Sequence, residues 1–144
     1  MMLAVLRVRG RRKVRPKVEK TLELLLLNRP NHCVLIEDTD QNIGMLNVVK
    51  DYITYGPIDE ETIYKLLYKR GKVAGERFSA KHNEEAIRKV AKEIFSGKKT
   101  KDYVNPVFRL SPPSKGYKSV KKNYPEGDLG KREAGLSSLI RRMV

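Results

Sequence analysis

The sequence lacks the features that membrane-spanning and secreted proteins carry. None of its apolar runs comes near the roughly 20 residues that a membrane-spanning helix needs. The first ten residues already contain Arg7 and Arg9, which is atypical of a secretory signal peptide. We therefore expect a cytoplasmic protein with no membrane partner.

Cysteine and histidine are also scarce. Cys33 is the single cysteine, so it has no partner for an internal disulfide, and its place in the apolar run 33–36 predicts a small buried side chain. The two histidines, His32 and His82, have no Cys or His at metal-ligand spacing. A Gly-rich phosphate loop and a nucleophile elbow are missing as well. We predict a protein that is not an enzyme and that has no cofactor, no metal site and no small-molecule substrate.

Acidic residues are too few to balance the basic ones. The chain has 31 Lys and Arg against 17 Asp and Glu, which gives a formal net charge of +14. The net charge is +7 over residues 1–30, −6 over 31–64, +12 over 65–122 and +1 over 123–144. A polyanion relieves the self-repulsion of such a chain, and the acidic block between two basic ones indicates that particular surfaces are basic. This pattern favours a nucleic acid as the partner.

Hydrophobic patterns predict the order β-α-β-α-β within the first 58 residues. Side chains alternate over residues 2–8, which predicts a strand. An apolar stripe that includes Leu25 and Leu26 predicts a helix over residues 16–29. Gly44 weakens the next helix, which indicates a close packing contact or an approach of RNA there. The remaining elements are a buried strand at 32–37, a helix at 42–51 capped by residues 38–40, and a strand at 52–55 that Gly56 and Pro57 end.

Two helices covering one face of a three-stranded sheet is the economical packing for this order, which makes the fold class α+β. The later sequence is helical and more basic. It predicts a helix from Asp59 to Gly71 and a second helix that is capped by Asn83 and whose inner face includes Ile94 and Phe95. A short strand at 107–110 and a helix at 132–143 follow. The basic segment between them, at 115–124, is expected to become ordered on binding a partner. We therefore expect a compact core at 1–58 and a mostly helical extension at 59–144.

Clustered carboxylates raise one catalytic alternative, a metal-dependent nuclease. Oxygen ligands for a divalent metal occur in two groups, which are Glu37, Asp38 and Asp40, and Asp59, Glu60 and Glu61. Both groups lie where helices begin, so capping and helix-dipole roles already account for them. No general base is spaced to complete a catalytic site. A binding protein is the better interpretation.

Basic residues concentrate at the turn between the first strand and the first helix. Arg side chains bind phosphate bidentately, and the N-terminus of the helix adds its own positive end. Stacking on bases would need aromatic side chains, for which Tyr103, Phe108, Tyr117 and Tyr124 are the candidates. The residues of this turn that are candidates for binding the phosphates of a nucleic acid are Arg9, Arg11, Arg12, Lys13, Arg15 and Lys17.

Several segments resemble one known family. Those near the start are Leu-Arg-Val-Arg-Gly at 6–10, residues 17–27, Val-Leu-Ile-Glu-Asp-Thr at 34–39 and Gly-Met-Leu-Asn at 44–47. They are similar to the large-subunit ribosomal protein L30 family (uL30), whose eukaryotic members are called L7. Residues 124–133 and 139–143 resemble the C-terminal element of the archaeal and eukaryotic members. The archaeal type of the family fits best.

This resemblance implies a ferredoxin-like β-α-β-α-β core and a role as a structural constituent of the large ribosomal subunit. The implied partners are large-subunit ribosomal RNA, with proximity to the 5S RNA, and neighbouring ribosomal proteins. The resemblance extends the expected RNA contacts to Arg77, Lys81, Lys115, Lys118, Lys121 and Lys122. The alternative is a DNA-binding chromatin protein, because net charge does not distinguish one nucleic acid from another.

Overall fold

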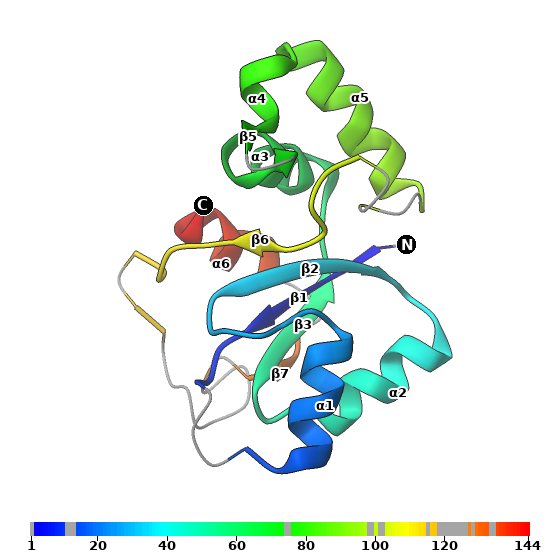
Figure 1. Ribbon diagram of the computed structural model, residues 1–144, viewed down its shortest axis with the longest axis vertical. Helices are drawn as coiled ribbons and strands as arrows, with labels where there is room; N and C mark the ends of the chain where they lie inside the picture. The colour runs from blue at the N-terminus through cyan, green and yellow to red at the C-terminus, as the bar shows by residue number, and fades with distance from the viewer. Residues whose placement is uncertain are drawn as a thin grey trace.

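The computed structural model describes residues 2–10, 14–73, 76–97, 100, 103–114, 116–117, 127, 129–132 and 135–144. A five-stranded sheet lies at the centre of the molecule, with helices on both of its faces (Figure 1). The elements are β1 (Met2–Arg7), α1 (Pro16–Leu24), β2 (His32–Glu37), α2 (Asp40–Val48), β3 (Ile53–Pro57), α3 (Glu60–Arg70), β4 (Lys72–Val73), β5 (Glu76–Arg77), α4 (Phe78–Lys81), α5 (Glu84–Phe95), β6 (Phe108–Arg109), β7 (Gly130–Lys131) and α6 (Leu136–Met143).

The first three strands form the predicted β-α-β-α-β core. Strand β1 lies between β2 and β3 and is antiparallel to both, with Val5 opposite Val34 on one side and Tyr55 on the other. Strands β2 and β3 are therefore parallel to each other and are connected through α2. This split β-α-β arrangement is the ferredoxin-like core, so the predicted α+β fold class is confirmed.

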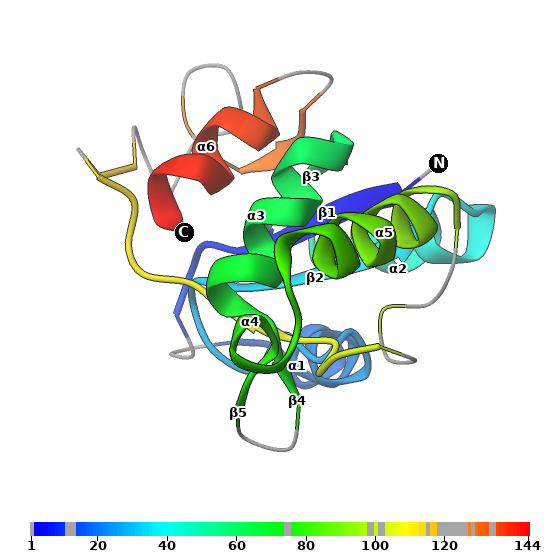
Figure 2. The ribbon, with the colours of Figure 1, turned by 90° about the horizontal axis from the view of Figure 1, so that it is seen from above.

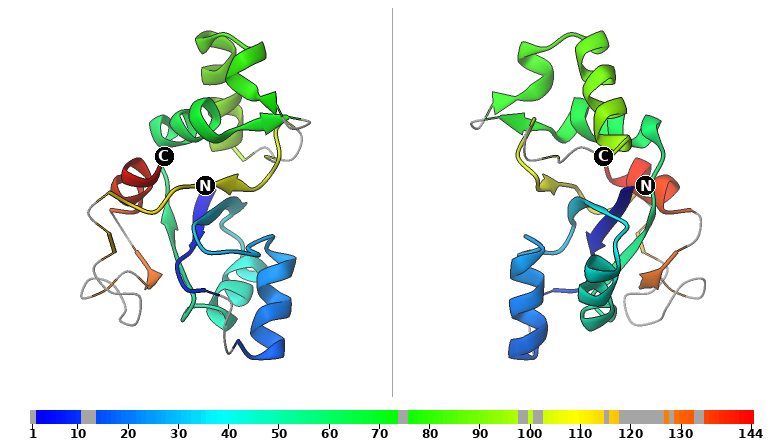
Figure 3. Two further views of the ribbon diagram at one scale, coloured as in Figure 1. Left: turned by 60° about the vertical axis from the view of Figure 1, so that its left-hand side comes forward. Right: turned by 90° about the vertical axis from the view of Figure 1, so that its right-hand side faces the viewer.

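Helices α1 and α2 cover one face of this sheet (Figure 3). Leu3 and Val5 of β1 point toward them because alternate strand residues face opposite sides. The side chains that complete this layer come from both helices and the neighbouring strands, and they are Leu22, Leu25, Leu27, Val34, Leu46, Val49, Ile53 and Tyr55. The prediction that two helices pack on one face is confirmed.

The later helices cover the opposite face (Figure 2). Met2, Ala4 and Leu6 of β1 pack in one apolar cluster with buried residues of α3, α5 and α6. The helix predicted at 132–143 begins at Leu136, and its apolar residues Leu136, Leu139, Ile140 and Met143 are all buried. The division of the chain at residue 58 stays a prediction, because residues on both sides of that boundary share the cluster.

Two short strands pair with the edges of the three-stranded core. Strand β6 is antiparallel to β2, and β7 is parallel to β3. At the second edge the backbone of Arg132 approaches Gly56 so closely that a Cβ atom at Gly56 would collide with the Arg132 carbonyl oxygen. The Nε atom of Arg132 also donates a hydrogen bond to Oγ1 of Thr54 at 2.9 Å. This contact fixes residues 130–132 against the core.

Helix α1 is shorter than predicted and ends at Leu24 rather than Arg29. Leu26 has a φ angle of +64°, and the backbone N–H groups of Leu26 and Leu27 donate back to the carbonyls of Glu23 and Leu22. This pair of bonds is the Schellman motif, which ends a helix at a left-handed residue. Leu27 is consequently buried, while Leu26 is 42% exposed, so the prediction that Leu26 belongs to the inner face was wrong.

Three further expectations differ from the structure. A Cβ atom at Gly44 would meet nothing within 4 Å, so no close packing contact explains this glycine. Phe95 is 40% exposed rather than on the inner face of α5. Gly56 and Pro57 lie within β3 rather than ending it, since they pair with Ala4 and Leu3 of β1. Gly71 ends α3 as predicted, and the carbonyl of Leu67 lies where its Cβ would be. None of the described helices is long and apolar enough to cross a membrane.

Candidate nucleic-acid interface

Arg7 organises the start of the basic turn. This residue ends β1, and only 3% of its surface is exposed. Its Nε and Nη2 atoms donate hydrogen bonds to the carbonyls of Arg9 and Gly10 at 3.0 and 3.2 Å, and Nη1 donates to the carbonyl of Leu27 at 2.6 Å. The rigid guanidinium fork suits several acceptors at once better than an ammonium group does. Arg7 therefore ties the turn to the segment that follows α1.

The described RNA-binding candidates of the turn lie at the molecular surface. The guanidinium of Arg9 lies 5.2 Å from the centre of the Tyr52 ring. Arg15 and Lys17 are exposed at the start of α1, where Pro16 begins the helix and no described side chain caps it. Uncapped N–H groups and the positive end of the helix dipole favour an anion there. The other three candidates, Arg11, Arg12 and Lys13, lie outside the described residues.

A second basic site lies between the C-terminal end of α3, the β4–β5 hairpin and β6. It is a pocket of about 300 Å³ lined by Asn105, Val107 and five cationic side chains, which are Lys69, Arg70, Lys72, Arg77 and Arg109. We call it the basic pocket. Among the described residues no carboxylate lines it.

The prediction from sequence found only Arg77 of this pocket. The cationic residues at 69–72 are a local signal that sequence reasoning could have used. The sequence around Arg109 carries no such local signal, because Arg109 reaches the pocket through the pairing of β6 with β2. Of the other candidates in the extension, Lys81 ends α4 and its side chain is not described. The remaining four, Lys115, Lys118, Lys121 and Lys122, lie outside the described residues, and all these RNA contacts stay predictions.

His32 pairs with Arg109 across the β2–β6 ladder. Its Nδ1 atom is buried and has no hydrogen-bond partner within the described part of the chain. Burial lowers the pKa of His32 below its ordinary value of 6.5, and the charges of Arg109, Arg29 and Arg7 lower it further. Burial and the three arginines therefore both disfavour the protonated form of His32, and the arginines place positive charge beside the basic pocket.

The aromatic candidates for base stacking have structural roles. Phe108 is fully buried in the core, so it is not available to stack on a base. The hydroxyl of Tyr103 donates a hydrogen bond to Glu93 at 2.6 Å, and that of Tyr117 donates to Asn31 at 2.6 Å. Both rings also pack against the hydrophobic core. The fourth candidate, Tyr124, lies outside the described residues.

Only one of the two predicted carboxylate groups supplies a helix cap. Asp59 accepts a hydrogen bond from the backbone N–H of Thr62 at 2.8 Å and caps α3, and Thr39 rather than a carboxylate caps α2. Burial acts to raise the pKa of Asp59, but hydrogen bonding to Thr62 and the charges of Arg141 and Lys65 outweigh it, so this pKa is lowered. The described residues contain no group of three His, Cys, Asp or Glu side chains that could hold a metal ion.

Cys33 is the small buried side chain that the sequence predicts. None of its surface is exposed, and burial raises the pKa of its thiol to about 12. Its thiol is therefore protonated at neutral pH, and reactivity requires the thiolate. Cys33 therefore serves as a small apolar side chain of the core rather than as a reactive thiol.

Comparison with known proteins agrees with this combination of fold and basic surface. The family model described as "Ribosomal protein L30p/L7e" matches residues 3–53. The chain is 42% identical to the large ribosomal subunit protein uL30 of Archaeoglobus fulgidus over 99% of each chain. It is 41% identical to the uL30 proteins of Methanococcus maripaludis, over 100% of both chains, and of Thermoplasma volcanium, over 99% of this chain and 93% of that one.

These matches place the chain among the ribosomal proteins. Within that class, it belongs to the family of the large ribosomal subunit protein uL30. The resemblance noted in the sequence is thereby confirmed over the whole chain, the segments after residue 53 included. None of the matched proteins supports the DNA-binding alternative.

Proposed function

We propose that this protein binds large-subunit ribosomal RNA through the basic turn at residues 9–17. As a uL30 protein it is a structural constituent of the large ribosomal subunit. The observation that carries the proposal is the way Arg7 fixes the turn. Two hydrogen bonds from the buried Arg7 guanidinium set the backbone at Arg9 and Gly10 before any partner binds, and a third connects them to Leu27. A preorganised turn loses less conformational entropy on binding RNA.

The charges around the turn suit a phosphate backbone. Arg9, Arg15 and Lys17 present cationic groups at the surface, and the N-terminus of α1 adds backbone donors. Contacts of this kind position a protein on RNA without reading its sequence. We infer a role in holding RNA structure rather than in catalysis, carried out on the ribosome in the cytoplasm.

Two finer expectations belong to the same proposal. The family assembles with ribosomal RNA and other ribosomal proteins, and we infer that neighbouring ribosomal proteins and the 5S RNA lie near this chain. The acidic ends of α3 and α5 support a protein neighbour, because Glu60, Glu61, Glu84 and Glu85 are exposed there on an otherwise basic molecule. A basic segment of another ribosomal protein has the complementary charge.

The test replaces Arg11, Arg12 and Lys13 together by Ala. Each lost phosphate contact removes a released counterion, so the slope of log affinity against log salt should fall by about 2 to 3. The matched control replaces Lys89 and Lys92, which are exposed on α5. Titration of transcribed large-subunit RNA at several salt concentrations gives both slopes. An unchanged slope in the triple variant would remove the turn from the interface.

The same titration distinguishes RNA from DNA. We expect tight preference for the folded ribosomal RNA over duplex DNA of equal length. A second measurement follows the natural protein through a sucrose gradient of a cell lysate in high salt. Comigration with the large subunit supports the proposed role, whereas release to the top of the gradient at moderate salt would contradict it.

A further inference from the structure

The basic pocket gathers more cationic side chains than the helix and strands around it explain. Lys69 and Arg70 lie in the last turn of α3, where cations are favourable near the negative end of the helix dipole. That explanation does not extend to Lys72 and Arg77 on the hairpin or to Arg109 on β6. One contact on the protein is known, since Nη2 of Arg70 donates to Oγ of Ser111 at 2.7 Å. Like charges gathered around one pocket repel each other until an anion enters.

The elements around the pocket are held by backbone hydrogen bonds. The N–H of Phe78 donates to the carbonyl of Gly71 at 2.9 Å across the base of the hairpin. The N–H of Asn105 donates to the carbonyl of Lys72 at 2.8 Å, which connects the hairpin to the segment that leads into β6. The pocket is therefore defined by backbone positions and not only by flexible side chains. A volume of about 300 Å³ is at the small end of ligand sites and suits a phosphate with its ribose.

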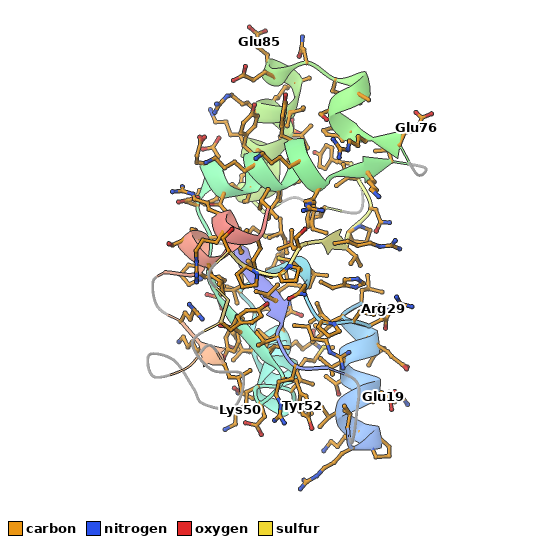
Figure 4. The ribbon with its side chains drawn as sticks, turned by 90° about the vertical axis from the view of Figure 1, so that its left-hand side faces the viewer. Glu19, Arg29, Lys50, Tyr52, Glu76 and Glu85 are labelled. Carbon is orange, nitrogen blue, oxygen red and sulfur yellow. The ribbon has the colours of Figure 1, made fainter. Side chains whose placement is uncertain are left out.

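The positive surface continues past the pocket along β6. Arg109 lies opposite His32, and Arg29 is close enough to lower the pKa of that histidine. Figure 4 shows Arg29 on the same side of the molecule as Glu76 of the hairpin, with β6 between them. A single strand of RNA backbone that lies in the pocket and continues past Arg109 would meet Arg29 next. The cationic side chains therefore form a row that extends beyond the pocket.

We propose that the basic pocket binds consecutive phosphates of the ribosomal RNA backbone and is a second RNA contact, separate from the basic turn. This inference rests on the proposed function, since it takes ribosomal RNA as the polyanion. Lys69 and Lys72 act as point charges, whereas Arg77 and Arg109 offer planar donor pairs that bind a phosphate bidentately. Sequence selectivity is not expected here, because the described lining presents no aromatic side chain for stacking.

The first test replaces Lys72 and Arg109 together by Ala. These two residues come from different elements, and both are exposed, so the double variant tests the pocket without opening the core. The matched control is Lys89→Ala with Lys92→Ala, which removes the same charge from α5. We expect about tenfold weaker binding to transcribed large-subunit RNA and a salt slope lower by about 2 in the pocket variant, and much smaller changes in the control. Equal changes in the two variants would overturn the proposal.

The second test uses the natural protein and needs no folding control. A lysine-acetylating reagent is applied to the free protein and to its complex with the RNA, and modified positions are read by mass spectrometry. We expect Lys69 and Lys72 to be protected in the complex while Lys89 and Lys92 stay reactive. Full reactivity of Lys69 and Lys72 in the complex would overturn the proposal.

The two proposals fail in different ways. If the natural protein shows no preference for ribosomal RNA over duplex DNA, the proposed function is wrong and the pocket loses its partner. If the turn variant weakens RNA binding while the pocket variant matches the Lys89 and Lys92 control, the pocket is not part of the interface and the proposed function stands. If both variants weaken binding and their free-energy changes add in the combined variant, the protein holds RNA at two independent places.

Discussion

The Nη1 atom of Arg7 lies 2.6 Å from the carbonyl oxygen of Leu27, twenty residues further along the chain. Leu27 is the residue at which the Schellman motif returns the backbone to the core after α1. One guanidinium therefore satisfies a buried carbonyl at the end of a helix and two carbonyls of the turn before that helix. The guanidinium of Arg7, which shapes the start of the turn, is buried, whereas Arg15 and Lys17, which we expect to contact RNA, are exposed.

Replacing Arg7 by Met should destabilise the protein by about 3 kcal/mol, because it leaves the carbonyls of Arg9, Gly10 and Leu27 without this donor. The control is Arg15→Met, an exposed change whose expected effect is within about 0.5 kcal/mol. Urea unfolding followed by circular dichroism measures both. Equal stability of the two variants would show that Arg7 does not hold the turn.

Replacing two glycines by alanine should change the free energy of unfolding in opposite directions, because the surroundings of the two glycines differ. Gly56→Ala places a Cβ against the carbonyl of Arg132, and we expect a loss of about 1 to 3 kcal/mol. Gly44→Ala meets open space inside a helix and should raise the free energy of unfolding by about 1 kcal/mol. Thermal and urea unfolding give both values. A Gly56→Ala protein as stable as the natural one would mean that residues 130–132 are not held against β3 in solution.

The left-handed residue after α1 offers a stabilising substitution. Leu26→Gly removes the steric penalty of a φ angle of +64° and should raise the free energy of unfolding by about 1 kcal/mol. The control, Leu24→Gly, changes an exposed residue inside the helix and should lower it by about 1 kcal/mol. If both substitutions destabilise equally, the helix continues past Leu24 in solution.

The depressed pKa of His32 predicts a pH dependence of stability. The folded protein resists protonation of His32, whereas the unfolded chain accepts the proton at the ordinary value of 6.5. The contribution of His32 to stability is therefore complete above pH 6.5 and decreases as the pH falls from 6.5 toward the lower folded pKa. His32→Gln should abolish this decrease. Arg109→Gln should reduce it, because one of the charges that lower the pKa is removed.

Chemical denaturation at several pH values between 5 and 8 measures the effect, and NMR titration of the His32 ring gives its pKa directly. A titration midpoint at or above 6.5 in the free protein would contradict the prediction. The Arg109→Gln variant separates the two causes, since burial of His32 remains while one cation is lost.

The sequence predicted the elements that have strong local signals. Asp59 and Asn83 cap α3 and α5 as expected, because a capping side chain acts on backbone N–H groups only two or three residues away. The alternation in residues 2–8 likewise assigned the two faces of β1 correctly, since strand periodicity is visible in six residues. These features depend on neighbours in the chain.

The features that sequence reasoning missed depend on contacts between distant segments. Strand β7 has two residues, too few for a periodicity, and only its pairing with β3 defines it. Strand β6 lies within the strand predicted at 107–110, but its pairing with β2 could not be predicted from the sequence. Phe108 was a candidate for base stacking, but its position opposite Cys33 in the β2–β6 pair places it in the core. The basic pocket was missed for the same reason, because it forms only when β6 brings Arg109 to the hairpin. The end of α1 was misplaced because leucine is rare at a left-handed position.

The two-residue strands that flank the core have a consequence for how the protein behaves before it reaches a ribosome. Strands β2 and β3 would be unpaired, mainly apolar edges if β6 and β7 were absent, and such edges recruit other chains by backbone pairing. The segments that cover them follow about fifty residues or more after the core in the sequence. While the chain is being synthesised, the finished core therefore presents both edges uncovered. A nascent or truncated chain that ends before residue 108 should self-associate far more readily than the full chain, whose outermost strands are too short to serve as a template.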